Sequence, residues 1–120
     1  MSRSIARFLL GGVAPPQLLQ TALNFAAAEG MAVRENSPGH VLLSKGSIWW
    51  AGRRCLRVWA QPMPAGSDVL VEAWVDTTFG EFNANPGEFL GALPRGMAWS
   101  VARRFVESLG IQALSVFVHA

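Results

Sequence analysis

The sequence has few charged residues and only one cysteine. Asp, Glu, Lys and Arg make up 15% of its 120 residues, against about a quarter in an average soluble domain. Cys55 has no second cysteine to pair with, which excludes an internal disulfide. Two histidines and one thiol also fall short of the four ligands of a usual structural zinc site. The sequence therefore predicts neither a metal site nor a cofactor.

Long apolar runs are also missing. No segment approaches the roughly 20 apolar residues that span a bilayer. Residues 2–16, SRSIARFLLGGVAPP, place two arginines before a short apolar run, as a signal sequence does. However, two prolines stand where a small-residue cleavage site would be needed. We therefore expect a soluble, cytoplasmic protein.

Hydrophobic residues, by contrast, make up 51% of the chain. So little charge leaves much of the surface weakly polar, and the simplest explanation is that a second copy of the chain covers part of it. The net charge is +2 and the pI is about 9.5. Because ionisable groups of both signs are few, this pI is only weak support for a polyanionic partner.

The first half of the chain predicts a strand, a helix and two more strands. Apolar residues alternate in 4–10, which suits a strand with one buried face. Residues 17–29 carry apolar side chains at helical spacing, and Gly30 is placed to end that helix. The two following strands are expected at 31–36 and 40–45, on either side of a Ser-Pro-Gly turn.

A hairpin of residues 53–63 and 68–76, joined by the loop PAGS, is the strongest strand signal. Before it lies 47–51, SIWWA, a short aromatic strand or loop in which Trp49 and Trp50 point to opposite faces if extended.

The two faces of this hairpin differ in chemistry. One face is aliphatic and is predicted to face the core: Leu56, Val58, Ala60, Val71, Ala73 and Val75. On the other face, a loop of two or four residues centred on PAGS pairs Arg57 with Trp74, Trp59 with Glu72, Gln61 with Leu70 and Cys55 with Asp76. A different loop length changes these pairs, but alternation within each strand keeps every residue on its face.

The last third of the chain is predicted as a long loop, a helix and a strand. Residues 77–96 are rich in glycine and proline and form a loop with at most one short strand or helical turn. Residues 95–109 have a clear apolar stripe ending at Gly110. In 111–120, alternating apolar residues favour a final strand.

These elements predict a single α+β domain over residues 1–120. The order is strand, helix, four strands, helix, strand, and the expected architecture is a two-layer sandwich: a mainly antiparallel sheet with two helices packed on one face. This order is similar to that of TATA-binding-protein-like and helix-grip folds, whose curved sheets carry helices on one side. Such a similarity concerns the fold and not the function.

The candidate site is the sheet face opposite the helices, with Arg57, Trp59, Glu72 and Trp74. A tryptophan can bury about 200 Å², so we expect something to cover both indole rings. Our main hypothesis is a homodimer in which the tryptophans anchor the contact and Arg57 pairs with Glu72 or stacks on Trp74.

Three alternatives stay open from the sequence. Residues 77–96 or the C-terminal strand could fold over this face and form a second core. The face could instead form a cleft for an apolar or aromatic small molecule, lined by Trp59, Trp74 and either Trp49 or Trp50, with Arg57 available for an anionic group. Single-stranded nucleic acid is the least favoured partner, because such surfaces usually carry more Lys and Arg.

No motif specifies an enzyme. Cys55 is expected beside Asp76, whose carboxylate would raise the pKa of the thiol and so make it less reactive. His40 and His119 have no evident catalytic partner in the sequence. The glycine-containing stretches lack the lysine and hydroxyl of a phosphate loop and the spacing of a dinucleotide site. We therefore predict no catalytic residue and a non-enzymatic protein.

Overall fold

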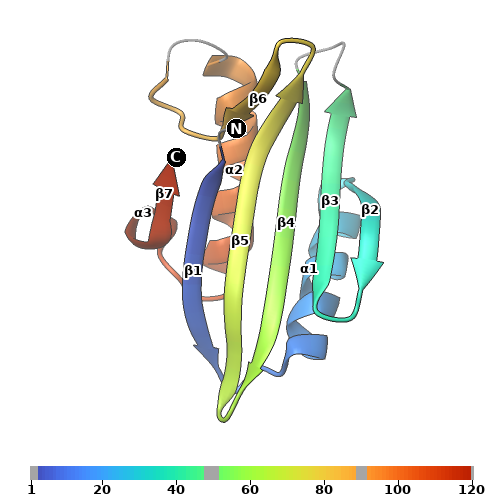
Figure 1. The fold of residues 1–120 in the computed structure, drawn as a ribbon, viewed down its shortest axis with the longest axis vertical. Helices are drawn as coiled ribbons and strands as arrows, with labels where there is room; N and C mark the ends of the chain where they lie inside the picture. Colours follow the sequence, from blue (N-terminus) through green and yellow to red (C-terminus); the bar gives the residue numbers. More distant parts are fainter. Residues whose placement is uncertain (1–2, 48–51, 89–91, 120) are drawn as a thin grey trace.

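The computed structural model describes residues 3–47, 52–88 and 92–119. The elements follow the chain in the order β1 (Ser4–Gly11), α1 (Pro15–Glu29), β2 (Ala32–Ser37), β3 (His40–Ser47), β4 (Gly52–Met63), β5 (Gly66–Thr77), β6 (Gly80–Asn83), α2 (Ala92–Ser108), α3 (Ala113–Val116) and β7 (Phe117–His119) (Figure 1). The predicted order is confirmed, and the structure adds the short elements β6 and α3.

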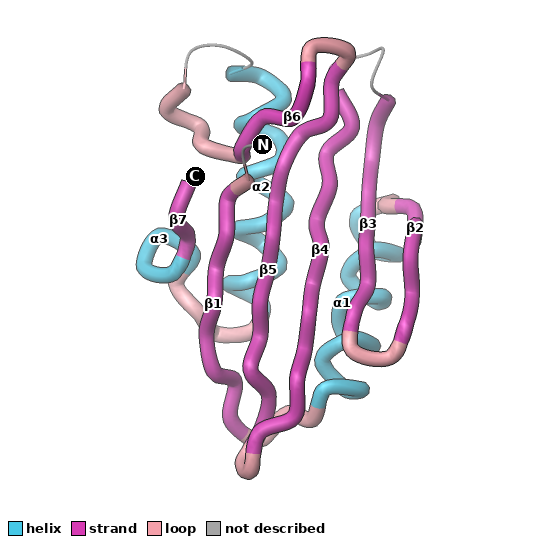
Figure 2. Tube along the Cα trace, viewed as in Figure 1, coloured by secondary structure: helices cyan, strands magenta, loops and turns pink. Residues whose placement is uncertain are grey.

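All strands belong to one antiparallel sheet. Its order is β2-β3-β4-β5-β1-β7, and β6 pairs with one end of β5. Helices α1 and α2 lie on the same side of this sheet (Figures 1 and 2). The predicted two-layer α+β sandwich is therefore confirmed. We call the sheet surface that faces away from α1 and α2 the open face.

The ends of α1 follow from its sequence. Pro15 and Pro16 occupy the first helical positions, where a missing N–H costs nothing. The Gln17 side chain accepts a hydrogen bond from the backbone N–H of Ala14 (3.2 Å), which serves as the N-cap. At the other end Gly30 adopts a left-handed conformation and its N–H reaches back to the last turn.

The core lies between the sheet and the two helices. The six aliphatic residues predicted for the inner face of the hairpin are all buried there. Small residues on both helices, such as Ala22 and Ala102, let the helix backbones approach the sheet closely. Phe25 and Phe105 meet edge to face (centroids 5.3 Å apart) and so join α1 to α2.

The register of the central hairpin differs from the prediction by two residues. Met63 pairs with Gly66, so the turn is the two residues Pro64 and Ala65 and lies one residue earlier than expected. The open-face pairs are therefore Arg53–Asp76, Cys55–Trp74, Arg57–Glu72, Trp59–Leu70 and Gln61–Asp68. The predicted partners were wrong, but the predicted faces were right, because a shift of two residues preserves alternation.

The remaining segments extend the sheet in its plane. Within residues 77–96, β6 forms the short strand that the loop was expected to contain and pairs with β5. The predicted C-terminal strand is shorter than expected, because residues 113–116 form the helical turn α3 and only β7 pairs with β1. Neither β6 nor β7 covers the open face, which argues against a second core formed by these strands. Trp49 and Trp50 lie outside the described residues.

Candidate functional site

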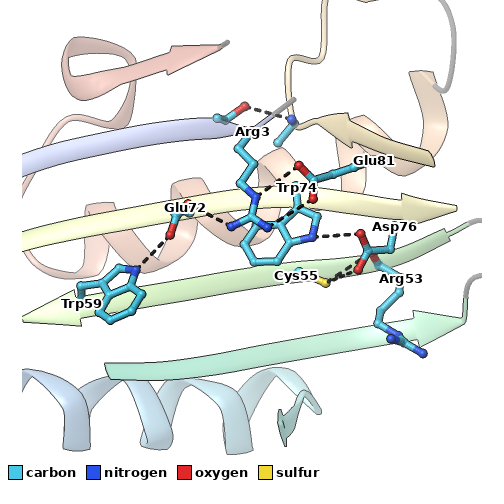
Figure 3. Close-up of polar contacts among 10 residues, drawn as sticks. Arg3, Arg53, Cys55, Trp59, Glu72, Trp74, Asp76 and Glu81 are labelled. Carbon is cyan, nitrogen blue, oxygen red and sulfur yellow. Dashed lines mark hydrogen bonds and ion pairs between the residues drawn. The ribbon is translucent and has the colours of Figure 1, made fainter. Parts of the chain in front are cut away.

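Four of the predicted site residues lie close together on the open face. Arg57 and Trp59 belong to β4, and Glu72 and Trp74 to the neighbouring strand β5. Alternation along the strands places all four away from the helices. Trp59, Glu72 and Trp74 belong to a network of polar contacts that also includes Arg3 (Figure 3).

Arg3 covers Trp74. Its guanidinium carbon lies 3.8 Å from the centre of the indole ring, a cation–π contact. Only 4% of Trp74 is exposed, so the chain itself shields this ring. The interpretation that Trp74 needs a second molecule to cover it was therefore wrong. Arg3 was missed because it precedes the predicted strand, although the alternation of Arg3, Ile5 and Arg7 already pointed it to the open face.

Two carboxylates hold Arg3 over the ring. Its Nη1 donates to Glu72 (3.0 Å), and its Nε and Nη2 each donate to Glu81 (3.2 Å) (Figure 3). Burial alone would lower the pKa of Arg3, but its hydrogen bonds and charge interactions with Glu81 and Glu72 raise that pKa overall. Trp74 in turn donates from Nε1 to Asp76 (3.1 Å). The charged groups and the indole ring at this end of the open face therefore find their partners within one chain.

Trp59 differs from Trp74 because one face of its ring remains accessible. Its Nε1 donates to Glu72 (2.9 Å), and its ring stacks on His40 with centroids 4.3 Å apart. Even so, 38% of the residue is exposed. Glu72 therefore links Trp59 to Arg3, and through Arg3 to Trp74.

Arg57 lies between the two indole rings. Its guanidinium carbon is 5.8 Å from the ring centre of Trp59 and 5.6 Å from that of Trp74. Although its Cα is paired with that of Glu72, it forms its ion pair with Glu35 of β2 (3.5 Å). The Arg57–Glu72 ion pair, one of the two contacts predicted for Arg57, is absent because Arg3 and Trp59 occupy that carboxylate. The other, with the ring of Trp74, is present within the chain.

The other end of the open face, near the β4–β5 turn, is apolar and exposed. We call it the apolar patch; it comprises the exposed residues Ile5, Leu9, Trp59 and Met63 and the half-buried Leu70. Val118 of β7 lies beside Ile5 in the register and is exposed as well. Arg7 and Asp68 form an ion pair (2.7 Å) within this patch, because Arg7 is paired with Leu70 and Asp68 with Leu9. A shallow hollow of about 170 Å³ lies against the ring of Trp59.

Cys55 is buried beside Asp76 and is not an activated nucleophile. Its Sγ lies 3.6 Å from Asp76 Oδ2, although its cross-strand partner is Trp74. Burial, together with the nearby carboxylate, raises the pKa of Cys55 to about 12. The expected proximity to Asp76 is therefore present, but through a diagonal contact and not through the predicted pair.

Both histidines have structural partners. His40 Nδ1 is 2.9 Å from Ser37 Oγ, and its Nε2 is 3.3 Å from Glu35. His119 Nδ1 is 2.5 Å from Ser4 Oγ, and burial lowers the pKa of His119. Ser4 is fully buried, and its Oγ accepts a hydrogen bond from the backbone N–H of Ala84 (2.9 Å). This hydroxyl is therefore not accessible to a substrate.

Within residues 3–47, 52–88 and 92–119, no group of three His, Cys, Asp or Glu side chains is arranged to hold a metal ion. None of the helices described is long and apolar enough to cross a bilayer.

A second cavity, of about 410 Å³, lies on the helix side of the sheet. It is lined by Glu29, Lys45, Arg54, Gly96, Met97, Ser100, Val101 and Arg104. These residues were not predicted from the sequence as a site. The sequence nevertheless contained a signal for a polar site on the helix side, because alternation places the charged Arg54 on the same face of its strand as the core residues Leu56 and Val58.

Comparisons with known proteins identify no relative. No protein-family model matches the chain, and neither a curated protein nor a solved structure is significantly similar to it. The similarity to TATA-binding-protein-like and helix-grip folds therefore stays one of element order. Function has to be argued from the geometry of the chain alone.

Proposed function

We propose that this chain is a non-enzymatic protein that forms a homodimer through the apolar patch of its open face, with Trp59 at the centre of the contact. The main observation in support of this proposal is that large apolar side chains on neighbouring strands are exposed together on one sheet face. Leu9 is 66% exposed and Trp59 38% exposed. Burying such side chains is favourable by about 25 cal/mol per Å², and a second copy offers a surface of the same kind.

The size and charge of the open face support this proposal. The two longest principal extents of the whole molecule are 42 and 26 Å, so the open face, of which the apolar patch is one end, offers an outline comparable with the roughly 800 Å² per partner that a stable interface buries. Arg3 and the strands β1, β4, β5 and β6 place equal numbers of arginines and carboxylates on this face: Arg3, Arg7, Arg53, Arg57, Asp68, Glu72, Asp76 and Glu81. Two copies can therefore meet without net repulsion.

The size and charge of the open face argue against a small molecule or single-stranded nucleic acid as its partner. The hollow at Trp59, about 170 Å³, is smaller than the roughly 300 to 1,000 Å³ of typical small-molecule sites. Because the arginines of these strands are balanced by carboxylates, the face lacks the positive potential that single-stranded nucleic acid requires. A protein surface is the partner that fits an exposed, shallow and neutral face.

The test compares two leucines of similar exposure. Leu9→Glu places a charge in the apolar patch, whereas Leu114→Glu places one on α3, where Leu114 is 83% exposed. We expect the unmodified chain and Leu114→Glu to be dimers by analytical ultracentrifugation. Leu9→Glu should raise the dimer dissociation constant by roughly thirtyfold or more, as the loss of a hot-spot contact does.

Trp59→Ala is the second variant for the same measurement. It removes the ring from the patch, and we expect a dissociation constant raised by a similar factor. Circular dichroism should show that each variant is folded. A wild-type chain that sediments as a monomer at millimolar concentration would refute the proposal, and so would equal dissociation of the Leu9 and Leu114 variants.

A further inference from the structure

The cavity on the helix side of the sheet contains a buried arginine that has no counter-ion among residues 3–47, 52–88 and 92–119. Arg54 is 9% exposed and lines the cavity between the end of α1, strand β3 and the middle of α2. A buried charge is costly and is normally paired with an opposite charge. All eight Asp and Glu residues of the sequence fall within the described ranges. None of the ion pairs among these described side chains includes Arg54.

The backbone around Arg54 is shaped to hold its guanidinium in place. Nη1 donates to the carbonyl of Gly52 (3.3 Å), which is its one hydrogen bond to the described residues. At Gly46, which has a φ of +94°, a Cβ would lie 2.6 Å from Nη1. Glycine at this position therefore leaves the space that the guanidinium fills. Since a guanidinium carries five N–H donors, four remain for a bound group.

Two further cations lie at the same cavity and are held by α1. Lys45 Nζ donates to the carbonyl of Glu29 at the end of the helix (2.9 Å). Arg104 donates from Nη2 and Nε to the two oxygens of the Glu29 carboxylate (2.7 and 3.0 Å). The Arg104 hydrogen bond is the main reason that the pKa of Glu29 is lowered. Three cations and one carboxylate leave the cavity with two uncompensated positive charges.

We propose that this cavity is an anion-binding pocket for a small phosphate monoester, with Arg54 as the ligand of the phosphate. A phosphate monoester carries about −1.5 to −2 charges at pH 7, which matches the charge of the cavity. The planar fork of an arginine binds phosphate oxygens in pairs.

The remaining walls suit the organic part of such a compound. Met97 and Val101 of α2 form an apolar wall, and the hydroxyl of Ser100 and the open space beside Gly96 adjoin it. A volume of about 410 Å³ falls within the range of small-molecule sites and exceeds what a single phosphate ion needs. The pocket opens on the side of the sheet opposite the apolar patch, so its occupancy does not depend on the proposed dimer.

Calorimetric titration with phenyl phosphate tests the proposal, with benzoate as a probe that has the same ring and a carboxylate. We expect saturable binding of phenyl phosphate to the wild-type chain and weaker binding of benzoate. Arg54→Met retains most of the side-chain volume and should weaken phenyl phosphate binding roughly ten- to hundredfold, the effect of losing hydrogen bonds to a charged group. Arg54→Lys should lose less affinity for phenyl phosphate, since it keeps the positive charge but not the planar pair of donors of the guanidinium.

Arg103→Met is the matched control. Arg103 neighbours Arg104 on α2, but it pairs with Glu107 and does not line the cavity, so this variant should bind phenyl phosphate as the wild type does. Without ligand, Arg54→Met should melt at the same temperature as the wild type or higher, because it removes an unpaired buried charge. Backbone amide shifts of Ser100 and Val101 should move on titration.

Three results would overturn the proposal. The first is the absence of saturable phenyl phosphate binding by the wild-type chain. The second is that Arg54→Met binds phenyl phosphate as tightly as the wild type does, or that Arg103→Met loses as much affinity for it as Arg54→Met does. The third is benzoate binding as tight as that of phenyl phosphate, which would contradict the assignment of a phosphate group.

Discussion

Replacing Gly66 with alanine is expected to lower the free energy of unfolding by about 3 kcal/mol, the upper end of the usual cost of overpacking. Gly66 begins β5 and lies opposite Gly11 of β1. A Cβ at Gly66 would lie 2.1 Å from the carbonyl oxygen of Leu10 and 2.9 Å from the Cα of Gly11. Since these are backbone atoms of a paired strand, they cannot move aside without disturbing the sheet. Urea denaturation followed by circular dichroism measures the change.

Gly11→Ala is the control for this prediction. Gly11 is the direct partner of Gly66, but a Cβ there meets only the carbonyl oxygen of Ala65, at 3.9 Å. This is an ordinary van der Waals contact, so we expect a change below about 1 kcal/mol. Similar losses for both variants would mean that the close approach of the two backbones is not what determines stability at this end of the sheet.

Cys55 is expected to react with a disulfide reagent at pH 8 at least roughly thirtyfold more slowly in the folded chain than in urea. A pKa raised to about 12 from 9.0 lowers the thiolate fraction by about a thousandfold, and the higher nucleophilicity of a more basic thiolate offsets only part of that loss. Asp76→Asn should speed up the reaction of the folded chain, because it removes a charge that raises the pKa of the thiol. Equal rates in the folded and unfolded chains would contradict the burial of Cys55.

The same pKa difference determines how stability depends on pH. The folded chain retains the Cys55 proton at pH values where the unfolded chain has already lost it. This contribution to stability is complete below about pH 9 and decreases as the pH rises toward 12. A Cys55→Ser variant should show a smaller loss of stability over this alkaline range when both proteins are denatured by urea.

The two proposed sites lie on opposite sides of the sheet and have opposite character. The apolar patch is shallow, exposed and neutral, and suits a flat partner such as a second copy of the chain. The pocket at Arg54 lies between the sheet and the two helices, is larger and positively charged, and suits a small anion. A dimer formed through the open face would leave both pockets accessible, so binding and self-association can be measured independently in the same protein.

Much of the architecture could be predicted from the sequence because it depends on local periodicity. Alternation assigned every hairpin residue to its correct face, and helical spacing located α1 and α2 to within a few residues. The pairing within the hairpin could not be predicted with the same accuracy. Pro64 and Ala65 form the turn, whereas PAGS was expected to be the loop, and strand alternation cannot distinguish registers that differ by two residues.

What the sequence alone determined about this protein is the two-layer fold, the chemistry of each sheet face and the absence of a second cysteine for a disulfide. Only the tertiary structure decided that Arg3 covers Trp74 while Trp59 remains exposed, because Arg3 is brought to Glu72 and Glu81 from a distant part of the chain. It likewise brought Arg54, Lys45 and Arg104 to one cavity. Charge pairing between remote residues depends on three-dimensional packing, and no local pattern encodes it.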